Sequence, residues 1–164
     1  VSLFPIVFML HEFEDIIGFK TWVIKDGLWI AKKYPKVAKQ ISIYERLSVP
    51  AFALAVLEEF ILIGIVTALA LTLQWYSVWI AVFLGFSLHI FIHIGQWMMV
   101  RKYIPIIITS LLSLPYIFWG THKIFSEFSF SMIITCFVIG TIVLIVNLRF
   151  VHKLALRYDK IRKK

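Results

Sequence analysis

The sequence predicts an all-α integral membrane protein, a bundle of five transmembrane helices, and three observations lead to this prediction. First, 61% of the 164 residues are hydrophobic and the mean hydropathy is +0.91, whereas soluble domains are about 45–50% apolar. A soluble chain of this length could not bury so much apolar surface. Second, several apolar segments are long enough to cross a bilayer, which takes about 20 helical residues. Third, almost all basic residues fall on one side of those segments.

The proposed spans differ in how clearly the sequence marks them. The three clearest are residues 49–73, 77–100 and 131–147. A fourth, at 103–119, is shorter and contains Pro105 and Pro115, whose freed backbone groups neighbouring helices can satisfy. Residues 3–19 form a marginal fifth span. They lack the basic region and the small-residue cleavage site of a signal peptide, so we interpret them as part of the mature bundle.

The distribution of basic residues predicts the orientation of the bundle. Five spans with the N-terminus outside leave segments 19–47, 101–102 and 148–164 in the cytoplasm, together with the C-terminus. Of the 17 lysines and arginines, only Lys123 then lies outside, as expected from the preference of basic residues for the cytoplasmic side. A four-span chain, with residues 3–19 in the membrane interface and the N-terminus inside, would keep this orientation for the other spans. We favour five spans.

We expect one domain, residues 1–164, with a cytoplasmic linker at 20–46 and a basic tail at 149–164. In the linker, aromatic residues alternate with lysines, and Gly27 and Pro35 interrupt it. This pattern is typical of one or two short helices lying among lipid headgroups. The net charge of +8 therefore predicts membrane lipids and anionic headgroups as partners, not nucleic acid. We expect a multi-pass protein of the plasma membrane. Whether it forms a homo-oligomer stays an open question at this point.

Ionisable side chains lie inside the proposed spans, where a charge costs about 2.5–3.5 kcal/mol at the bilayer centre. Counted from the cytoplasmic ends at about 1.5 Å per residue, they reach overlapping depths on the cytoplasmic side of the midplane. Such groups need a common partner, either one another or a cation. They are Glu12, Glu14, Asp15, Glu58, Glu59, His11, His89 and His93.

Helical spacing directs part of the first acidic segment to one face. His11, Glu14 and Asp15 stand at positions i, i+3 and i+4, so their side chains project from the same side of a helix. Glu12 points away from that face. We expect Glu12 to be solvated or to act as a helix-end charge.

The same reasoning applies to the later polar residues. His89, His93 and Gln96 follow the spacing i, i+4 and i+7, which again places them on one side of a helix. The adjacent residues Glu58 and Glu59 cannot share a face. One of the two glutamates can bind a cation while the other holds a ligand histidine by a hydrogen bond.

Three histidines with several carboxylates form the ligand set of a divalent metal site. Imidazole and carboxylate suit zinc, iron or manganese, and the single Cys136 offers neither a disulfide nor a thiolate cluster. We favour zinc, which in catalytic sites has three protein ligands and a water, and keep dinuclear iron as the alternative. A metal-free network or proton relay also stays open. The expected metal ligands are His11, Glu14, Asp15, Glu58, His89 and His93, and the expected catalytic residues are Glu59 and Glu58.

The segment His11-Glu12-Phe13-Glu14-Asp15 resembles the signature of the HXXEE-domain family, small multi-span membrane proteins without an assigned activity. Residues 89–109 are similar to the histidine helix of that family and its Tyr-x-Pro…Thr continuation. Asp15 stands where the family has its second glutamate, and Ile106 stands where a glycine often follows the proline. The resemblance implies a membrane protein with functional histidines and acids.

The ligand set predicts a metal-dependent membrane enzyme that hydrolyses a lipid-type ester or amide with metal-activated water, with a glutamate as the general base. Two irons would instead support oxidation or hydroxylation of a lipid chain. From another class, the same network fits a proton- or ion-coupled carrier, although five spans are few for a transporter and no inverted repeat is visible. A membrane scaffold would leave the costly charges unexplained.

Overall fold

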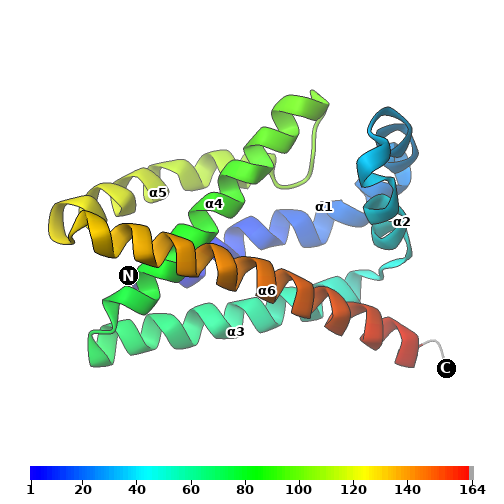
Figure 1. Cartoon of the computed structure of the whole chain (residues 1–164). Helices are drawn as coiled ribbons and strands as arrows, with labels where there is room; N and C mark the ends of the chain where they lie inside the picture. Colours follow the sequence, from blue (N-terminus) through cyan, green and yellow to red (C-terminus); the bar gives the residue numbers. More distant parts are fainter. Residues whose placement is uncertain (163–164) are drawn as a thin grey trace.

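Five long helices run back and forth along the molecule, and one short helix lies near the end that carries the C-terminus (Figure 1). The computed structural model describes residues 1–162, and these form no strand. The all-α prediction is confirmed. The helices are α1 (Phe4–Lys33), α2 (Ala38–Arg46), α3 (Val49–Leu73), α4 (Tyr76–Val100), α5 (Ile107–Glu127) and α6 (Phe130–Arg162), and a 3-10 turn, η1 (Pro35–Val37), precedes α2.

Three helices of the described chain, α3, α4 and α6, are long and apolar enough to cross a membrane. They correspond to the three clearest spans expected from the sequence, and α3 has the expected bounds. Helices α1 and α5, with 30 and 21 residues, are also long enough but carry more polar side chains. These helices are consistent with a membrane protein that has at least three spans.

The first turn of α3 is fixed by Ser48 and by a contact from the far end of the chain. The Ser48 hydroxyl oxygen accepts a hydrogen bond from the Ala51 amide at 3.3 Å, as a helix N-cap does. Pro50 lies in the first turn, where its missing N–H costs nothing. The buried Asp159 of α6 accepts hydrogen bonds from the Ser48 amide at 2.8 Å and the Ser48 hydroxyl at 2.5 Å. The last turns of α6 are thereby tied to the start of α3.

Helix α1 continues beyond the first expected span, which differs from the expected linker of separate short helices at 20–46. Gly27 does not interrupt α1. It is buried against Ile41 of α2, whose side chain lies 3.0 Å from where a Cβ on Gly27 would stand. The helix ends at Lys33 because Pro35 disfavours the helical conformation at the residue before it. α2 therefore packs on the second half of α1.

Helix α5 covers 107–127 instead of the expected 103–119. Pro105 disfavours helix at the residue before it, and residues 101–106 form a connecting segment between α4 and α5. This segment is attached to the second half of α1, because Lys102 forms an ion pair with Asp26 at 3.0 Å.

Helix α4 lies at the centre of the bundle, packed against α3, α5 and α6 and in contact with α1 through aromatic side chains. The ring centroids of Phe4 and Phe83 are 5.8 Å apart, and Phe83 stacks on Trp79 at 4.9 Å. α4 and α6 approach most closely at Gly140, where an added Cβ would collide with the backbone of Ala81. Only glycine fits at this crossing.

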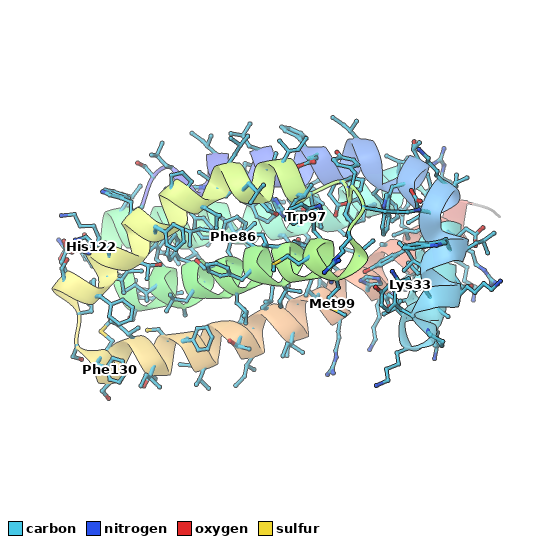
Figure 2. The ribbon with its side chains drawn as sticks, turned by 90° about the horizontal axis from the view of Figure 1, so that it is seen from above. Lys33, Phe86, Trp97, Met99, His122 and Phe130 are labelled. Atoms are coloured by element: carbon cyan, nitrogen blue, oxygen red, sulfur yellow. The ribbon has the colours of Figure 1, made fainter. Side chains whose placement is uncertain are left out.

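The two ends of the bundle differ in charge. Figure 2 places Lys33 at one end and His122 and Phe130 at the other. The Lys33 end, which we call the basic end, also carries α2, the 101–106 segment and the last turns of α6 (Figure 1). The lysines and arginines expected in the cytoplasm therefore gather on one side of the bundle. The last two of them, Lys163 and Lys164, lie outside the described residues.

Candidate metal centre

Three histidines from two helices meet inside the bundle. His11 of α1 is buried, and His89 and His93 of α4 are half-buried. One nitrogen from each imidazole can be chosen so that all three lie within 4.8 Å of one another. Phe86 packs beside them, with its ring centroid 6.1 Å from that of His11. The i, i+4 spacing of the two α4 histidines puts both side chains on the face toward α1.

His93 contacts two other polar side chains of α4, His89 and Gln96. Its Nε2 lies 2.7 Å from Nε2 of His89, and its Nδ1 lies 3.1 Å from Oε1 of Gln96. Because an amide oxygen only accepts hydrogen bonds, Nδ1 of His93 carries the proton. Its Nε2 then presents a lone pair to His89. The short contact between the two nitrogens requires a proton or a cation between them.

His11 is held by Thr109, which lies in the first turn of α5. The Thr109 hydroxyl oxygen lies 3.2 Å from Nδ1 of His11 and 2.6 Å from Oε2 of Glu14. The other ring nitrogen of His11, Nε2, is buried and has no hydrogen-bond partner among the described residues. A buried polar atom left unsatisfied is costly. Nε2 is therefore the atom in this cluster that most clearly lacks a ligand.

The Glu14 carboxylate of α1 caps the N-terminus of α5. Its carboxylate accepts hydrogen bonds from the Tyr103 hydroxyl at 2.9 Å, the Ile108 amide at 3.4 Å and the Thr109 amide at 2.8 Å. The first amides of a helix have no partners within the helix, and a negative charge there also interacts favourably with the helix dipole. These donors stabilise the carboxylate of Glu14 without a metal.

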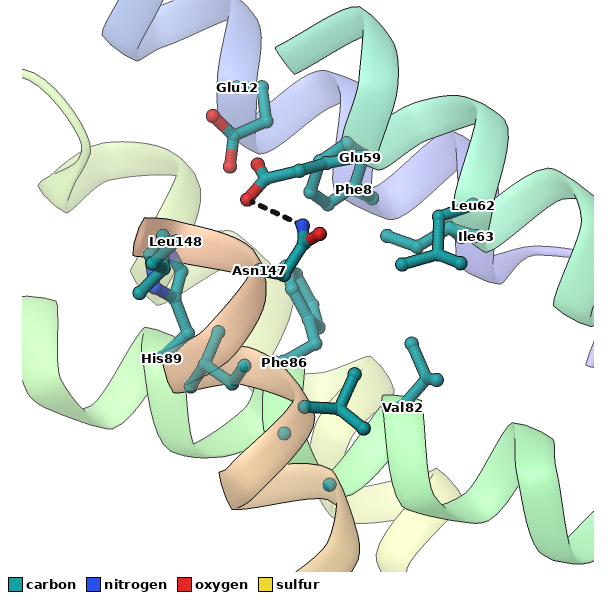
Figure 3. A pocket seen from close by; sticks show the side chains of 14 residues that line it. Phe8, Glu12, Glu59, Leu62, Ile63, Val82, Phe86, His89, Asn147 and Leu148 are labelled. Atoms are coloured by element: carbon teal, nitrogen blue, oxygen red, sulfur yellow. Dashed lines mark hydrogen bonds between the residues drawn. The ribbon is translucent and has the colours of Figure 1, made fainter. Parts of the chain in front are cut away.

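A small cavity adjoins the histidine cluster and shares His89 with it. Its volume is about 60 Å³, and its mostly apolar wall contains four polar side chains, those of Glu12, Glu59, His89 and Asn147. Figure 3 shows the Glu12 carboxylate facing that of Glu59. The cavity is large enough for water, and its four polar side chains could hydrogen-bond to it.

Asn147 of α6 joins the two neighbouring acids of α3. Its Nδ2 donates to Oε2 of Glu58 at 3.3 Å and to Oε1 of Glu59 at 3.4 Å. Glu59 lines the cavity, whereas Glu58 lines a separate groove together with Leu154 of α6. The two glutamates therefore occupy different faces, as expected.

Of the six expected metal ligands, the structure groups the three histidines and leaves the three acids outside that group. Asp15 is half-buried and interacts electrostatically with Glu12 and Glu14. Glu12 requires a correction, because it is 5% exposed instead of solvated. The expectation assumed that α1 packs on one face only, whereas α1 packs against both α3 and α5.

Asn147 was not identified from the sequence as part of the site, and Thr109 entered only as the threonine of the motif that residues 89–109 resemble. Asn147 stands alone among apolar residues of α6, and such an isolated polar residue was the available signal. The partners of Thr109 and Asn147 on α1 and α3 are 98 and 88 residues away. Spacing along the chain could not have paired them.

The backbone turns sharply just before α5. Ile106 has φ = 136° and ψ = −20°, a conformation that a β-branched residue rarely adopts and glycine adopts freely. This turn brings the amides of Ile108 and Thr109 to Glu14. The position is the one at which the resemblance to the HXXEE-domain family implies glycine.

We expect Ile106→Gly to be more stable than Ile106→Ala by about 1 kcal/mol, because both lose the buried side chain but only glycine relieves the strained φ. Thermal unfolding of the two purified variants measures the difference. The neighbouring pair Ile107→Gly and Ile107→Ala is the control, since Ile107 lies in the first turn of α5 and alanine is the better residue in a helix. The prediction is wrong if alanine is the more stable residue at both positions.

The three imidazoles fit zinc. Zinc–nitrogen bonds of about 2.0–2.1 Å in a tetrahedron separate the ligand nitrogens by about 3.3 Å. The closest pair in the cluster is 2.7 Å apart and all three nitrogens lie within 4.8 Å, a range that includes this separation. Two histidines one helical turn apart are a common pair of zinc ligands. The carboxylate of Glu14, which interacts electrostatically with His11, lowers the cost of a dication there.

A protein-family model described as "Protein of unknown function with HXXEE motif" matches residues 2–120. The match includes the three histidines, Glu14 and Thr109, and it ends before α6. No curated protein and no solved structure gives a match.

Proposed function

The chain belongs to the family of proteins with the HXXEE motif, and we propose that it is a membrane enzyme that binds one divalent metal ion, preferably zinc, and hydrolyses a lipid-type ester or amide. One observation carries the metal site. Three histidine nitrogens lie within 4.8 Å of one another, and Nε2 of His11 is buried with no hydrogen-bond partner in the part of the chain that the structure describes.

We propose that α1 and α5 cross the membrane beside α3, α4 and α6, so that the N-terminus lies outside and the basic end faces the cytoplasm. Five long helices in alternating direction support this arrangement (Figure 1). The preference of lysine and arginine for the cytoplasmic side also supports it. The location is then the plasma membrane, with anionic headgroups as neighbours of the basic end.

Zinc at the three histidines would polarise a carbonyl group and make a bound water more nucleophilic. Glu59 is the favoured proton acceptor, because it lines the cavity that His89 also lines. The Asn147 amide holds the Glu59 carboxylate by a hydrogen bond. Glu58 faces the separate groove and is less suited to the role.

The apolar environment supports a lipidic substrate. Leu62, Val143 and Leu144 are among the apolar residues that line the cavity, and most of its wall comes from α3, α4 and α6, which are long and apolar enough to cross a membrane. A substrate with an acyl chain could approach within the bilayer. Its ester or amide group would meet the polar side chains.

The position of the acids favours one metal over two. A dinuclear iron site in a helical bundle takes carboxylates among its ligands, whereas Glu14 already accepts hydrogen bonds from α5 and the three-histidine group includes no acid. A lipid oxidase is therefore less well supported than a hydrolase. The facing carboxylates of Glu12 and Glu59 support a second candidate, a proton- or ion-coupled carrier (Figure 3).

We expect Glu59→Gln to retain about one zinc per chain but to hydrolyse a fluorogenic fatty-acyl ester at least 100-fold more slowly than the wild type. Loss of a general base typically costs about 10²–10⁴ in rate, whereas Glu59 is not among the proposed zinc ligands. Elemental analysis and ester hydrolysis in detergent micelles measure the two quantities. Glu127→Gln, at the exposed end of α5, is the matched control and should behave as the wild type.

The other outcomes separate the alternatives. Two irons per chain would favour a lipid oxidase. A metal-free protein that keeps its thermal stability in chelator would favour the carrier. Zinc with equal hydrolysis by Glu59→Gln and wild type would overturn the assigned role of Glu59.

A further inference from the structure

We propose that Thr109 is a positioning residue that couples Glu14 to His11 and fixes which imidazole nitrogen faces the metal. The inference rests on the metal site proposed above and adds a part that the histidine cluster alone does not specify. The juxtaposition that carries it is one hydroxyl group of α5 lying between two side chains of α1.

The Thr109 hydroxyl has a single proton to donate. Three acceptors surround it: Oε2 of Glu14 at 2.6 Å, and the backbone oxygens of His11 and Ile106, each at 3.4 Å. A hydrogen bond from a hydroxyl to a carboxylate is short and strong because the acceptor is charged. The hydroxyl therefore donates to Glu14.

The direction of this hydrogen bond determines the tautomer of His11. With its proton directed to Glu14, the Thr109 oxygen can only accept, so Nδ1 of His11 at 3.2 Å is the donor. A neutral imidazole protonated at Nδ1 has its lone pair at Nε2. That atom is the buried nitrogen that has no hydrogen-bond partner within residues 1–162. The chain of hydrogen bonds thus presents a ligand lone pair where the cluster needs one.

The same contacts explain the spacing of the motif. His11 and Glu14 are three residues apart, so both project from one face of α1 and both reach the same threonine. Glu14 also holds the Thr109 amide at 2.8 Å, which fixes the first turn of α5 against α1. The acid of the motif therefore acts on the metal ligand through α5 and is not itself a ligand. Hydrogen-bond partners behind a metal-bound histidine orient it in this way in known sites.

The test compares Thr109→Val, which removes only the hydroxyl, with Thr109→Ser, which restores it. We expect Thr109→Val to bind zinc about 10–100-fold more weakly in competition with a chelator, as for other partners of metal-bound histidines, and Thr109→Ser to bind as the wild type. Thr141→Val is the matched control, because the Thr141 hydroxyl donates to the Phe137 carbonyl of its own helix, α6, which carries none of the three clustered histidines.

A second measurement needs no metal. In the metal-free protein, ¹⁵N NMR of labelled histidines should show His11 protonated at Nδ1, with His11→Gln identifying its signals, and Thr109→Val should shift His11 toward the Nε2-protonated form. His11 protonated at Nε2 in the wild type would overturn the proposal, even if Thr109→Val does not fold. Equal zinc affinity and an unchanged tautomer in a folded Thr109→Val would also overturn it. If the wild type binds no zinc, the metal site is wrong, and the NMR result alone decides the role of Thr109.

Discussion

His93→Ala is expected to lose zinc while the protein still inserts into the membrane. The substitution removes one of the three proposed ligands and also the contact at 2.7 Å between His93 and His89, leaving too few protein ligands for a catalytic zinc site. Because loss of a mere hydrogen-bond partner costs about 10–100-fold in metal affinity, we expect loss of this ligand to cost more than about 100-fold. Elemental analysis after purification, with the yield from the membrane fraction, measures both properties.

His122→Ala is the control for this experiment. His122 is exposed on α5 and lies at the end of the bundle opposite Lys33 (Figure 2), so its loss should leave the zinc content at about one per chain. Equal zinc content in His93→Ala and His122→Ala would remove the histidine cluster from consideration as the metal site.

Gly140→Ala is expected to destabilise the protein by about 1–3 kcal/mol, the usual cost of overpacking. The added methyl group would collide with the Ala81 backbone, and backbone cannot rotate away as a side chain can. At about 2–4 °C per kcal/mol for a chain of this length, the thermal midpoint in detergent should fall by several degrees. Separating α6 from α4 should also move Asn147 away from the acids of α3.

The matched control is Gly64→Ala. Gly64 lies in α3, and a Cβ there would meet nothing within 4 Å, while alanine stabilises a helix by about 1 kcal/mol relative to glycine. We expect an unchanged or higher midpoint for this variant. If both substitutions shift the midpoint equally, the close crossing of α4 and α6 is not a determinant of stability.

The sequence predicted the apolar helices best, because composition and length suffice for them. The expected bounds of α3 agree with the structure because its apolar run is uninterrupted, and the structure begins the helix directly after the N-cap Ser48. The length of α1 was not predictable in the same way, because Gly27 usually signals a break and continues the helix here only through its contact with Ile41 of α2. Tertiary packing, and not the local sequence, set the length of α1.

The candidate site was predictable only in part, because its other contacts depend on tertiary packing. The spacing of His89 and His93, and the unusual position of His11, indicated a shared cluster before any coordinates. The role of Glu14 was not visible, since its partners Tyr103 and Thr109 are 89 and 95 residues away. Helical spacing relates residues within one helix. It cannot show which other helix end packs against that helix.

The hydrogen bonds between Ser48 and Asp159 limit how the chain can be shortened for experiments. Hydropathy alone suggests that residues after about 148 are dispensable. Deleting them would leave the Ser48 amide without its acceptor at 2.8 Å and would expose Phe19, Val23 and Leu47, which share a buried apolar cluster with Val151 and Ala155 of the tail. Affinity tags and fusion partners are therefore better attached after residue 162 than placed in exchange for the tail.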